Sequence, residues 1–361
     1  MPTVGELTEA FRPITSLAAS WDPVGLQFGD PSQPVEAVAV CHEVTDPVVE
    51  RMESERPGLL VAYHPLLFRP PTSLVAGRSP SGRAFRLIRA GVALVVVHTG
   101  WDVHPSGTAD QLATAAGIVE PEPFGLQPGP EARKLVTFVP PDHEEALVEA
   151  LRSAGAGVIG DYTGCSFSSD GTGAFTAPED GDPFVGAAGA RTTVGERRIE
   201  MVVPAGAVEQ SVRALLAAHP YEEAAFDLVP IDGPARFIGR VGSVSTSVGA
   251  LATELSAALA FDGVRVVGDP AAPVARAAVV PGSGADFIGA ARSAGADVLV
   301  TGDLGHHRAR AALDAGMAVI DVAHIPGERP GIAALVEATR STAGLPVLDC
   351  TDLDPNPWET L

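Results

Sequence analysis

The chain has 361 residues, of which 46% are hydrophobic and 19% charged, and its 24 basic against 45 acidic residues give a net charge of −21. This length and hydrophobic content predict a globular protein of two or three domains, and the scattered negative charge disfavours nucleic acid as a partner, since phosphates repel it. No apolar run approaches the roughly 20 residues that span a bilayer, and the first residues lack the pattern of a signal peptide, so we expect a cytoplasmic protein without a membrane segment.

The first third of the chain alternates between helical and strand patterns. Apolar residues at helical spacing predict an opening helix over residues 4–17, and a turn-rich segment follows at 21–25. Further along, strands are expected at 35–40, 59–62 and 93–97, with helices at 46–55 and 83–90. Alternation of this kind is typical of an α/β fold with a mostly parallel sheet.

The middle of the chain has a different pattern, bracketed by turn-rich segments at 127–130 and 232–234. A strand at 134–139 precedes a helix at 144–154, and a strand at 199–203 precedes a helix at 207–218. Two such units in succession form the ferredoxin-like plan. We therefore predict an inserted α+β domain over residues 130–235.

The last third repeats the plan of the first, with strands expected at 277–280, 298–300 and 317–322 and helices at 285–294 and 309–313. One buried strand ends at His98 with Asp102 four residues on, and another ends at His324 with Glu328 four residues on. This recurrence indicates a duplicated α/β core. Its N-terminal half would be residues 1–129 and its C-terminal half residues 236–361.

Histidines gather where predicted strands end, which is where ligands bind in open α/β sheets. Six of the nine follow such ends: His64, His98, His104, His306, His307 and His324. Imidazole with carboxylate suits Zn, Mn, Fe or Ni, and no cysteine cluster accompanies them as in a structural thiolate site. Because a bound divalent ion can activate water, the pattern predicts a metal site with hydrolytic chemistry.

Five segments of the chain resemble the Nif-three-like family of dinuclear metal proteins, also called GTP cyclohydrolase I type 2 homologues. They are residues 21–27 (WDPVGLQ), 64–68 (HPLLF), 98–102 (HTGWD), 301–307 (TGDLGHH) and 324–328 (HIPGE). They lie in family order and span nearly the whole chain. The middle unit is similar to the PII-like, or CutA-like, insert of longer members, through residues 155–162, 165–168 and 219–223.

The resemblance implies two metal positions bridged by Glu328. One ion would be held by His64, Asp102 and Glu328, and the other by residue 63, His324 and Glu328. The family has a histidine where this chain has Tyr63, and a neutral phenol is a poor ligand near its ordinary pKa of about 10, although a dication can drive its ionisation. One and two divalent ions per chain therefore both stay open, with His98, His104 or His306 as substitutes for the missing histidine.

Several further residues allow two readings. Asp303 either orients a metal-binding histidine or caps the helix that follows, and His98 and His306 are further candidates for such supporting roles. His219, followed closely by two glutamates, is either a metal ligand or part of a turn. Trp21 and Asp22 read as turn and packing residues.

Two functions follow from these observations, and the sequence names no catalytic residue for either. The first is a metal-dependent hydrolase of a small phosphorylated or nucleotide-like substrate. The second is a non-catalytic metal-binding assembly with a regulatory or adaptor role, in which the insert senses or binds a partner. The resemblance implies a ring-shaped homohexamer, which fits both. The cyclohydrolase name comes from the resemblance alone, since no phosphate loop or other nucleotide fingerprint occurs.

Overall fold

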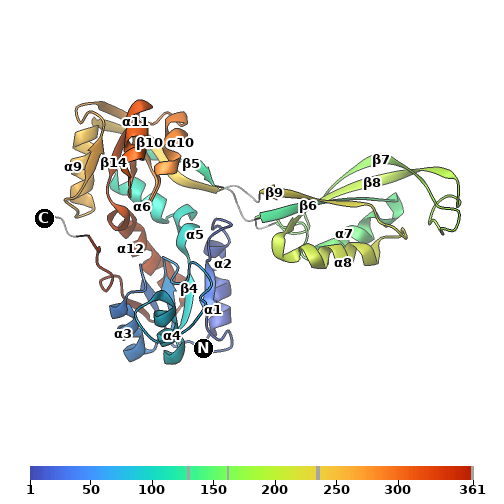
Figure 1. Cartoon of the computed structure of the whole chain (residues 1–361), viewed down its shortest axis with the longest axis horizontal. Coiled ribbons are helices and arrows are strands. Elements are labelled where there is room, and N and C mark those ends of the chain that lie inside the picture. The colour runs from blue at the N-terminus through green and yellow to red at the C-terminus, as the bar shows by residue number, and fades with distance from the viewer. Residues whose placement is uncertain (128–130, 161, 233–235, 359–361) are drawn as a thin grey trace. The chain divides into compact units, whose positions relative to one another are not determined.

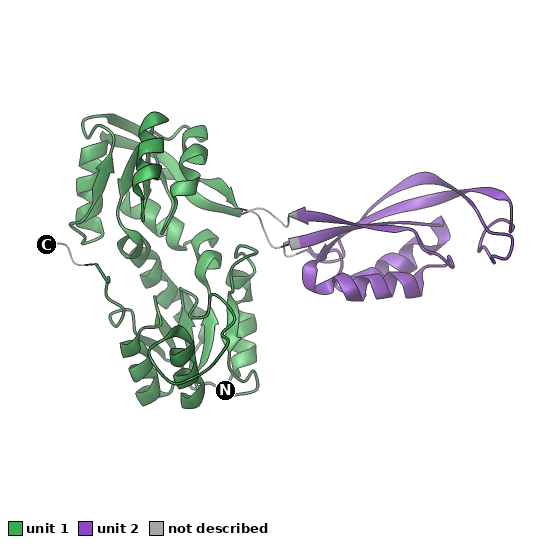
Figure 2. Ribbon diagram, viewed as in Figure 1, with its two compact units in different colours: residues 1–127, 236–361 green, residues 128–235 purple. Residues whose placement is uncertain are grey.

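The computed structural model of the chain describes residues 1–127, 131–160, 162–232 and 236–358 (Figure 1). These form two compact units, one of residues 1–127 with 236–361 and one of residues 128–235 (Figure 2). No helix within the described ranges is long and apolar enough to cross a membrane.

The first sheet of the larger unit is mostly parallel, as the alternating pattern predicts. Its strand order is β1-β4-β3-β2-β15, and only β1 runs antiparallel to its neighbour. The strands are β1 (Gly25–Phe28), β2 (Ala37–Cys41), β3 (Gly58–Ala62), β4 (Ala93–Val96) and β15 (Val347–Asp349).

Helices cover both faces of this sheet, which is why its central strands are apolar without interruption. Val38 and Val61 pack with the opening helix and the last helix, whereas Ala39 and Leu60 pack on the opposite face. The helices before the second sheet are α1 (Val4–Ala10), α2 (Arg12–Thr15), α3 (Asp46–Glu55), α4 (Pro80–Ala90), α5 (His98–Val103) and α6 (Thr108–Ala115), of which α6 packs in the core of the second sheet. The single helix expected over residues 4–17 is wrong, because Pro13 lacks the N–H that would continue it.

The second sheet combines three parallel strands with three antiparallel ones in the order β11-β14-β13-β12-β10-β5. Its strands are β5 (Val119–Gln127), β10 (Arg236–Ser247), β11 (Arg265–Val267), β12 (Pro273–Val279), β13 (Val298–Thr301) and β14 (Ala318–Asp321). Helices α9 (Val248–Ala258), α10 (Ile288–Ser293) and α11 (His306–Asp314) accompany it. β5 comes from the first third of the chain and β15 from the last, so each expected half gives a strand to the other's sheet. The duplication stays a prediction.

Helix α12 (His324–Ala343) joins the two sheets, and the sequence did not predict it. It begins three residues after β14 of the second sheet, and its later residues Ile332, Leu335 and Val336 pack in the core of the first. The indole N–H of buried Trp101 donates to the carbonyl oxygen of Gly331, 2.8 Å away. The helix therefore fixes the end of β14 against the first sheet.

The smaller unit is a four-stranded antiparallel sheet with strand order β7-β8-β6-β9. Its elements follow the order β6 (Glu131–Val139), α7 (Glu144–Ser153), β7 (Phe167–Thr176), β8 (Arg191–Pro204), α8 (Val208–Ala218) and β9 (Phe226–Asp232). This order and pairing are the ferredoxin-like plan. Leu135, Leu151 and Leu215 lie in its core between the sheet and the two helices. Its similarity to a PII-like or CutA-like insert stays a prediction.

The close approach of α6 and α12 gives a stability test. A Cβ at Gly331 would lie 2.5 Å from the Cα of Thr108, so Gly331→Ala forces the two helices apart. We expect the variant to lose about 1–3 kcal/mol of unfolding free energy, measured by chemical denaturation of the full chain. Gly289→Ala is the matched control, because a Cβ at this helical glycine meets nothing within 4 Å and should be neutral or stabilising. Equal effects of the two substitutions would contradict this packing argument.

Candidate metal centre

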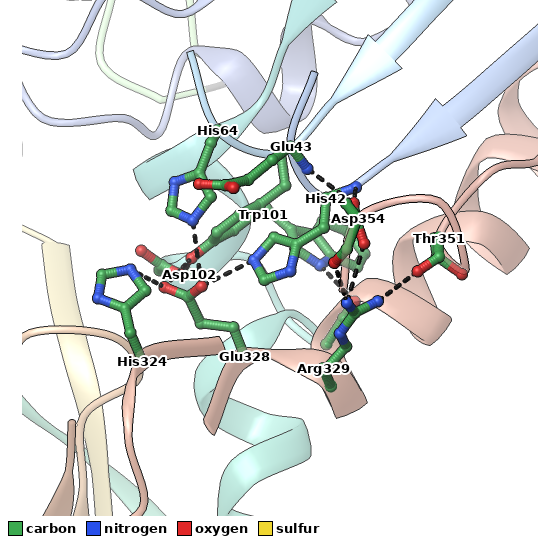
Figure 3. Close-up of polar contacts among 12 residues, drawn as sticks. His42, Glu43, His64, Trp101, Asp102, His324, Glu328, Arg329, Thr351 and Asp354 are labelled. Carbon is green, nitrogen blue, oxygen red and sulfur yellow. Dashed lines mark hydrogen bonds and ion pairs between the residues drawn. The ribbon is translucent and has the colours of Figure 1, made fainter. Parts of the chain in front are cut away.

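Polar side chains from both sheets of the larger unit meet where parallel strands end. Three of them directly follow β2 and β3, one lies on α5 after β4, and two lie in the first turns of α12 after β14 (Figure 3). In chain order they are His42, Tyr63, His64, Asp102, His324 and Glu328. Because α12 connects the second sheet to the first, ligands almost 300 residues apart in sequence lie within hydrogen-bond distance of each other, as His42 and Glu328 do.

Glu328 is the centre of this cluster, and its side chain is only 3% exposed. Its Oε2 lies 2.8 Å from His42 Nε2 and 3.2 Å from His64 Nε2, and its Oε1 lies 3.1 Å from His324 Nε2. Burial alone would raise the pKa of this carboxyl group, but the hydrogen bonds from the three imidazoles hold it well below its ordinary value. Glu328 is therefore an anion surrounded by nitrogen atoms.

His42, His64 and Glu328 form a candidate metal-binding triad. One ligand atom from each lies within 4.8 Å of the others. The His42 and His64 rings stack with centroids 4.9 Å apart and 16° between their planes. His42 is fully buried, and its Nδ1 has no hydrogen-bond partner among the residues that the structure describes. Two imidazole nitrogens and a carboxylate oxygen are the donor set of many divalent transition-metal sites, so these residues fit such an ion.

Tyr63 lies on the other side of Glu328. Its hydroxyl donates a hydrogen bond to Asp102 Oδ1 at 2.6 Å and is 3.3 Å from Glu328 Oε1. Burial and the charges of Asp102 and Glu328 raise the pKa of Tyr63 well above its usual value. A neutral phenol therefore separates the two carboxyl groups.

Asp102 is the second buried carboxyl group of the cluster. Burial raises its pKa to about 6, the nearby His98 lowers it, and the charge of Glu328 adds to the increase. At neutral pH Asp102 accepts the Tyr63 proton in a charge-assisted hydrogen bond.

The two His-x-x-x-carboxylate segments adopt the same local structure. His98 and His324 are each the first residue of a helix that follows a parallel strand. His98 Nδ1 lies 2.8 Å from Asp22 Oδ1, and His324 Nδ1 lies 2.7 Å from Asp303 Oδ2. A carboxylate on Nδ1 fixes the tautomer and the orientation of the ring. Of the two readings of Asp303, the contact with His324 favours the orienting role.

Asp22 has a larger role than the turn and packing one that its sequence context indicated. Its buried carboxylate accepts hydrogen bonds from the main-chain N–H and the hydroxyl of Thr99 as well as contacting His98. Burial opposes a charge on His98, but the hydrogen bond to Asp22 together with the charges of Asp22, Asp102 and Glu328 outweighs it and raises the pKa of His98. The sequence gave no sign of this contact because Asp22 and His98 are 76 residues apart.

The structure places the remaining candidates as follows. His306 is exposed at the first residue of α11, where its ring contacts His307, and the described contacts do not connect it to the cluster. His104 stacks on Trp101 with centroids 4.9 Å apart. His42, which the sequence analysis did not single out, supplies the additional imidazole instead. The rule that found the others applies to it, since it directly follows β2, whose end lies one residue beyond the expected end at residue 40.

The C-terminal segment holds the strand end that carries His42. Asp354 is buried, and its Oδ2 accepts hydrogen bonds from the main-chain N–H groups of His42 and Glu43, each at 2.8 Å (Figure 3). Its Oδ1 lies 2.9 Å from Arg329 Nη2, and Arg329 also donates to the main-chain oxygens of Thr351 and Asp354. Since Arg329 is next to Glu328, this network connects the backbone of one candidate ligand to the helix of another.

His219 of the smaller unit is a structural residue in a turn. Its Nε2 lies 2.9 Å from the main-chain oxygen of Phe138, and its Nδ1 accepts a hydrogen bond from the main-chain N–H of Tyr221. Both ring nitrogens are therefore engaged by the backbone. This favours the turn reading over the metal reading.

Known proteins match the chain over nearly its whole length. The family described as Duf34/NIF3 (NGG1p interacting factor 3) matches residues 3–356. A Mycobacterium bovis protein named "GTP cyclohydrolase 1 type 2 homolog" is 39% identical over 363 residues, covering 98% of this chain and 94% of that protein. A Bacillus subtilis protein of the same name is 35% identical and covers 88% and 86%.

Solved structures match the chain as completely. The crystal structure of a Bacillus cereus protein related to NIF3 has 31% sequence identity and a TM-score of 0.65, and the match covers 100% of this chain and 99% of that one. The Staphylococcus aureus protein SA1388 has 26% identity and a TM-score of 0.73 with the same coverage.

Removing the Asp354 carboxylate should weaken both the fold and the candidate site. Asp354→Ala removes the carboxylate that pairs with Arg329 and leaves two main-chain N–H groups without their acceptor, so we expect a loss of about 2–4 kcal/mol in unfolding free energy, together with weaker metal binding. Chemical denaturation and a metal titration of the full chain measure the two effects. The control is Asp352→Ala, whose side chain is exposed nearby. If both variants behaved alike, Asp354 would not hold the site.

The metal-free chain should lose stability as the pH rises from 6.5 to 9. Burial opposes a charge on His324, but Glu328 and Asp303 outweigh it and raise its pKa from 6.5 to about 9. A raised pKa of a base stabilises the fold fully below the unfolded value of 6.5, and the contribution disappears as the pH passes the folded value. Unfolding free energies of chelator-treated protein should show this decline, and His324→Gln should reduce it. A matched His307→Gln variant, altered at an exposed histidine, should retain the wild-type profile.

Proposed function

Because the chain belongs to the DUF34/NIF3 family, we propose that it holds a divalent metal ion with His42, His64 and Glu328 and hydrolyses a small phosphorylated or nucleotide-like substrate. The convergence of three ligand atoms within 4.8 Å carries the proposal. The substrate class rests on the names of the relatives, which are called homologues of a GTP cyclohydrolase.

The two oxygens of Glu328 support one ion per chain. Oε2 faces the two stacked imidazoles of His42 and His64, whereas Oε1 faces His324 and the Tyr63 hydroxyl. On the Oε1 side the phenol donates its proton to Asp102 at 2.6 Å and contacts Glu328 Oε1 at 3.3 Å, and its raised pKa disfavours the phenolate that would bind a cation. We therefore place the ion on the Oε2 side, with His42 compensating for the tyrosine at position 63.

A bound divalent ion would supply Lewis-acid activation of water and of a phosphoryl or carbonyl oxygen. The chain's own residues would do the rest. His324, whose two ring nitrogens contact Asp303 Oδ2 and Glu328 Oε1, would hold the Oε1 side of Glu328 in place. Tyr63 and Asp102 would keep the Oε1 side of Glu328 in a fixed orientation.

A non-catalytic metal-binding assembly is the second candidate function. The observation that favours it is Tyr63, which fills by hydrogen bonding the position where the family resemblance implies a second ion. In this reading the smaller unit would serve a regulatory or adaptor role. The homohexamer and the cytoplasmic location stay predictions under both functions.

Elemental analysis of purified protein tests the metal assignment. We expect one divalent ion per chain, its loss in His42→Ala and Glu328→Gln, and a second ion in Tyr63→His, because an imidazole there adds a nitrogen ligand beside Glu328 Oε1. The control His307→Ala, at an exposed position, should retain one ion. Two ions in the wild type, or an unaffected His42→Ala, would contradict the assignment.

The same preparations separate the two functions. Metal-loaded wild type should hydrolyse at least one member of a panel of nucleotides and phosphate esters, and Glu328→Gln should abolish that turnover. If protein that holds its ion hydrolysed none of these compounds, the hydrolase proposal would be wrong and the non-catalytic metal-binding assembly would be the remaining candidate.

A further inference from the structure

The smaller unit contains a cavity of about 380 Å³ that plays no part in the proposed metal chemistry. It lies among the end of β7, the segment that follows it, β8 and the turn after α8. We propose that this cavity binds a small organic cation with a flat apolar body, such as an aromatic amine. The proposal is independent of the metal centre, and a cavity of this size lies within the range of small-molecule sites.

Four aromatic side chains line the cavity: Phe138, Phe175, Phe184 and Tyr221. Phe184 is 53% exposed although its ring makes an edge contact with His143 at 5.4 Å and lies 6.1 Å from Tyr221. A large aromatic ring that is anchored on one side and open on the other offers a face to a ligand. Such faces attract both flat apolar groups and cations.

The carboxylate of Glu196 lies on the cavity wall and forms no ion pair with a basic residue that the structure describes. Glu196 is 9% exposed, and its Oε1 accepts a hydrogen bond of 2.8 Å from the Tyr221 hydroxyl. Within the described ranges, its Oε2 receives no hydrogen bond and no Lys, Arg or His forms an ion pair with it. A cationic ligand would give Glu196 the ion-pair partner that the described residues do not provide.

The remaining charged groups on the wall have the same sign. Asp182, Glu222 and Glu223 also line the cavity, and its lining contains no basic residue. Arg198 lines an adjacent hollow, lies over the Phe138 ring and is paired with Glu200. Two histidines contact lining residues from outside the cavity, His143 on Phe184 and His219 on Tyr221. This charge distribution favours a cation and excludes phosphate-bearing ligands such as nucleotides.

Gly173 provides the space that the Glu196 carboxylate occupies. A Cβ at Gly173 would lie 2.1 Å from Glu196 Oε2, so even a methyl group would displace the carboxylate. The carboxylate sits at the end of a flexible side chain, which can move without disturbing the sheet. Gly173→Ala is therefore a second way to alter the charge of the cavity without removing it.

Calorimetric titration of the full chain tests the proposal with three indoles of similar shape: tryptamine, which is cationic, tryptophol, which is neutral, and indole-3-acetate, which is anionic. The titrations are done in 0.3 M salt, where the Debye length is below about 8 Å and the diffuse charge of the chain is screened. We expect tryptamine to bind at least about tenfold more tightly than tryptophol, since hydrogen bonds to charged groups have that strength. Indole-3-acetate should not bind.

Substitutions in the cavity wall test whether tryptamine binds in this cavity. Glu196→Gln keeps the shape of the side chain and should weaken tryptamine binding about tenfold, and Gly173→Ala should weaken it similarly. Phe184→Ala should weaken tryptamine and tryptophol alike. The control is Glu209→Gln on α8, where the carboxylate is exposed, pairs with Arg213 and does not line the cavity.

Three outcomes would overturn the proposal: no tryptamine binding, equal binding of tryptamine and tryptophol, or an equal loss in Glu196→Gln and Glu209→Gln. The last would show attraction by the overall charge of the chain instead of recognition in the cavity. Loss confined to Glu196→Gln and Gly173→Ala would support it.

Discussion

The interaction on which the larger unit depends is that of one buried carboxylate, Glu328, with three imidazoles. The carboxylate is stable inside the protein because each oxygen faces at least one ring nitrogen. Its helix starts at one sheet and ends in the core of the other, so the same contact that prepares a cation site also fixes the two sheets relative to each other. A substitution that shifts α12 would therefore disturb the packing of the two sheets and the geometry around Glu328 together.

Much of this site follows from the sequence because parallel strands place their carboxyl ends at one edge. That rule identified His64, His324 and the carboxylates that follow the strands, and it applies equally to His42, which lies two residues after the expected end of its strand just as His64 does. It could not find Asp354, because a contact across 312 residues leaves no local pattern. Helix α12 was missed because residues 326–331 contain two prolines and two glycines, which usually mark a loop. Tertiary packing against both sheets overrides that preference.

Tyr63 shows how one substitution changes a site without emptying it. A histidine at this position would present a nitrogen to Glu328, whereas the phenol presents a proton that two carboxyl groups attract. The phenol thereby stabilises these carboxyl groups by hydrogen bonding without adding a charge. His42, whose buried Nδ1 makes no described hydrogen bond, supplies the imidazole that the other side of Glu328 needs.

The exchange of β5 and β15 between the two sheets has a consequence for folding kinetics. The first sheet is complete only after β15 from the far end of the sequence has joined it, the second only after β5 has paired with β10 across the smaller unit, and His42 pairs with groups 286 and 312 residues away. Such a topology has a high contact order, so neither half can acquire its ligand geometry first. A cation bound by His42, His64 and Glu328 would need both parts of the chain to be paired, so metal uptake would report that pairing.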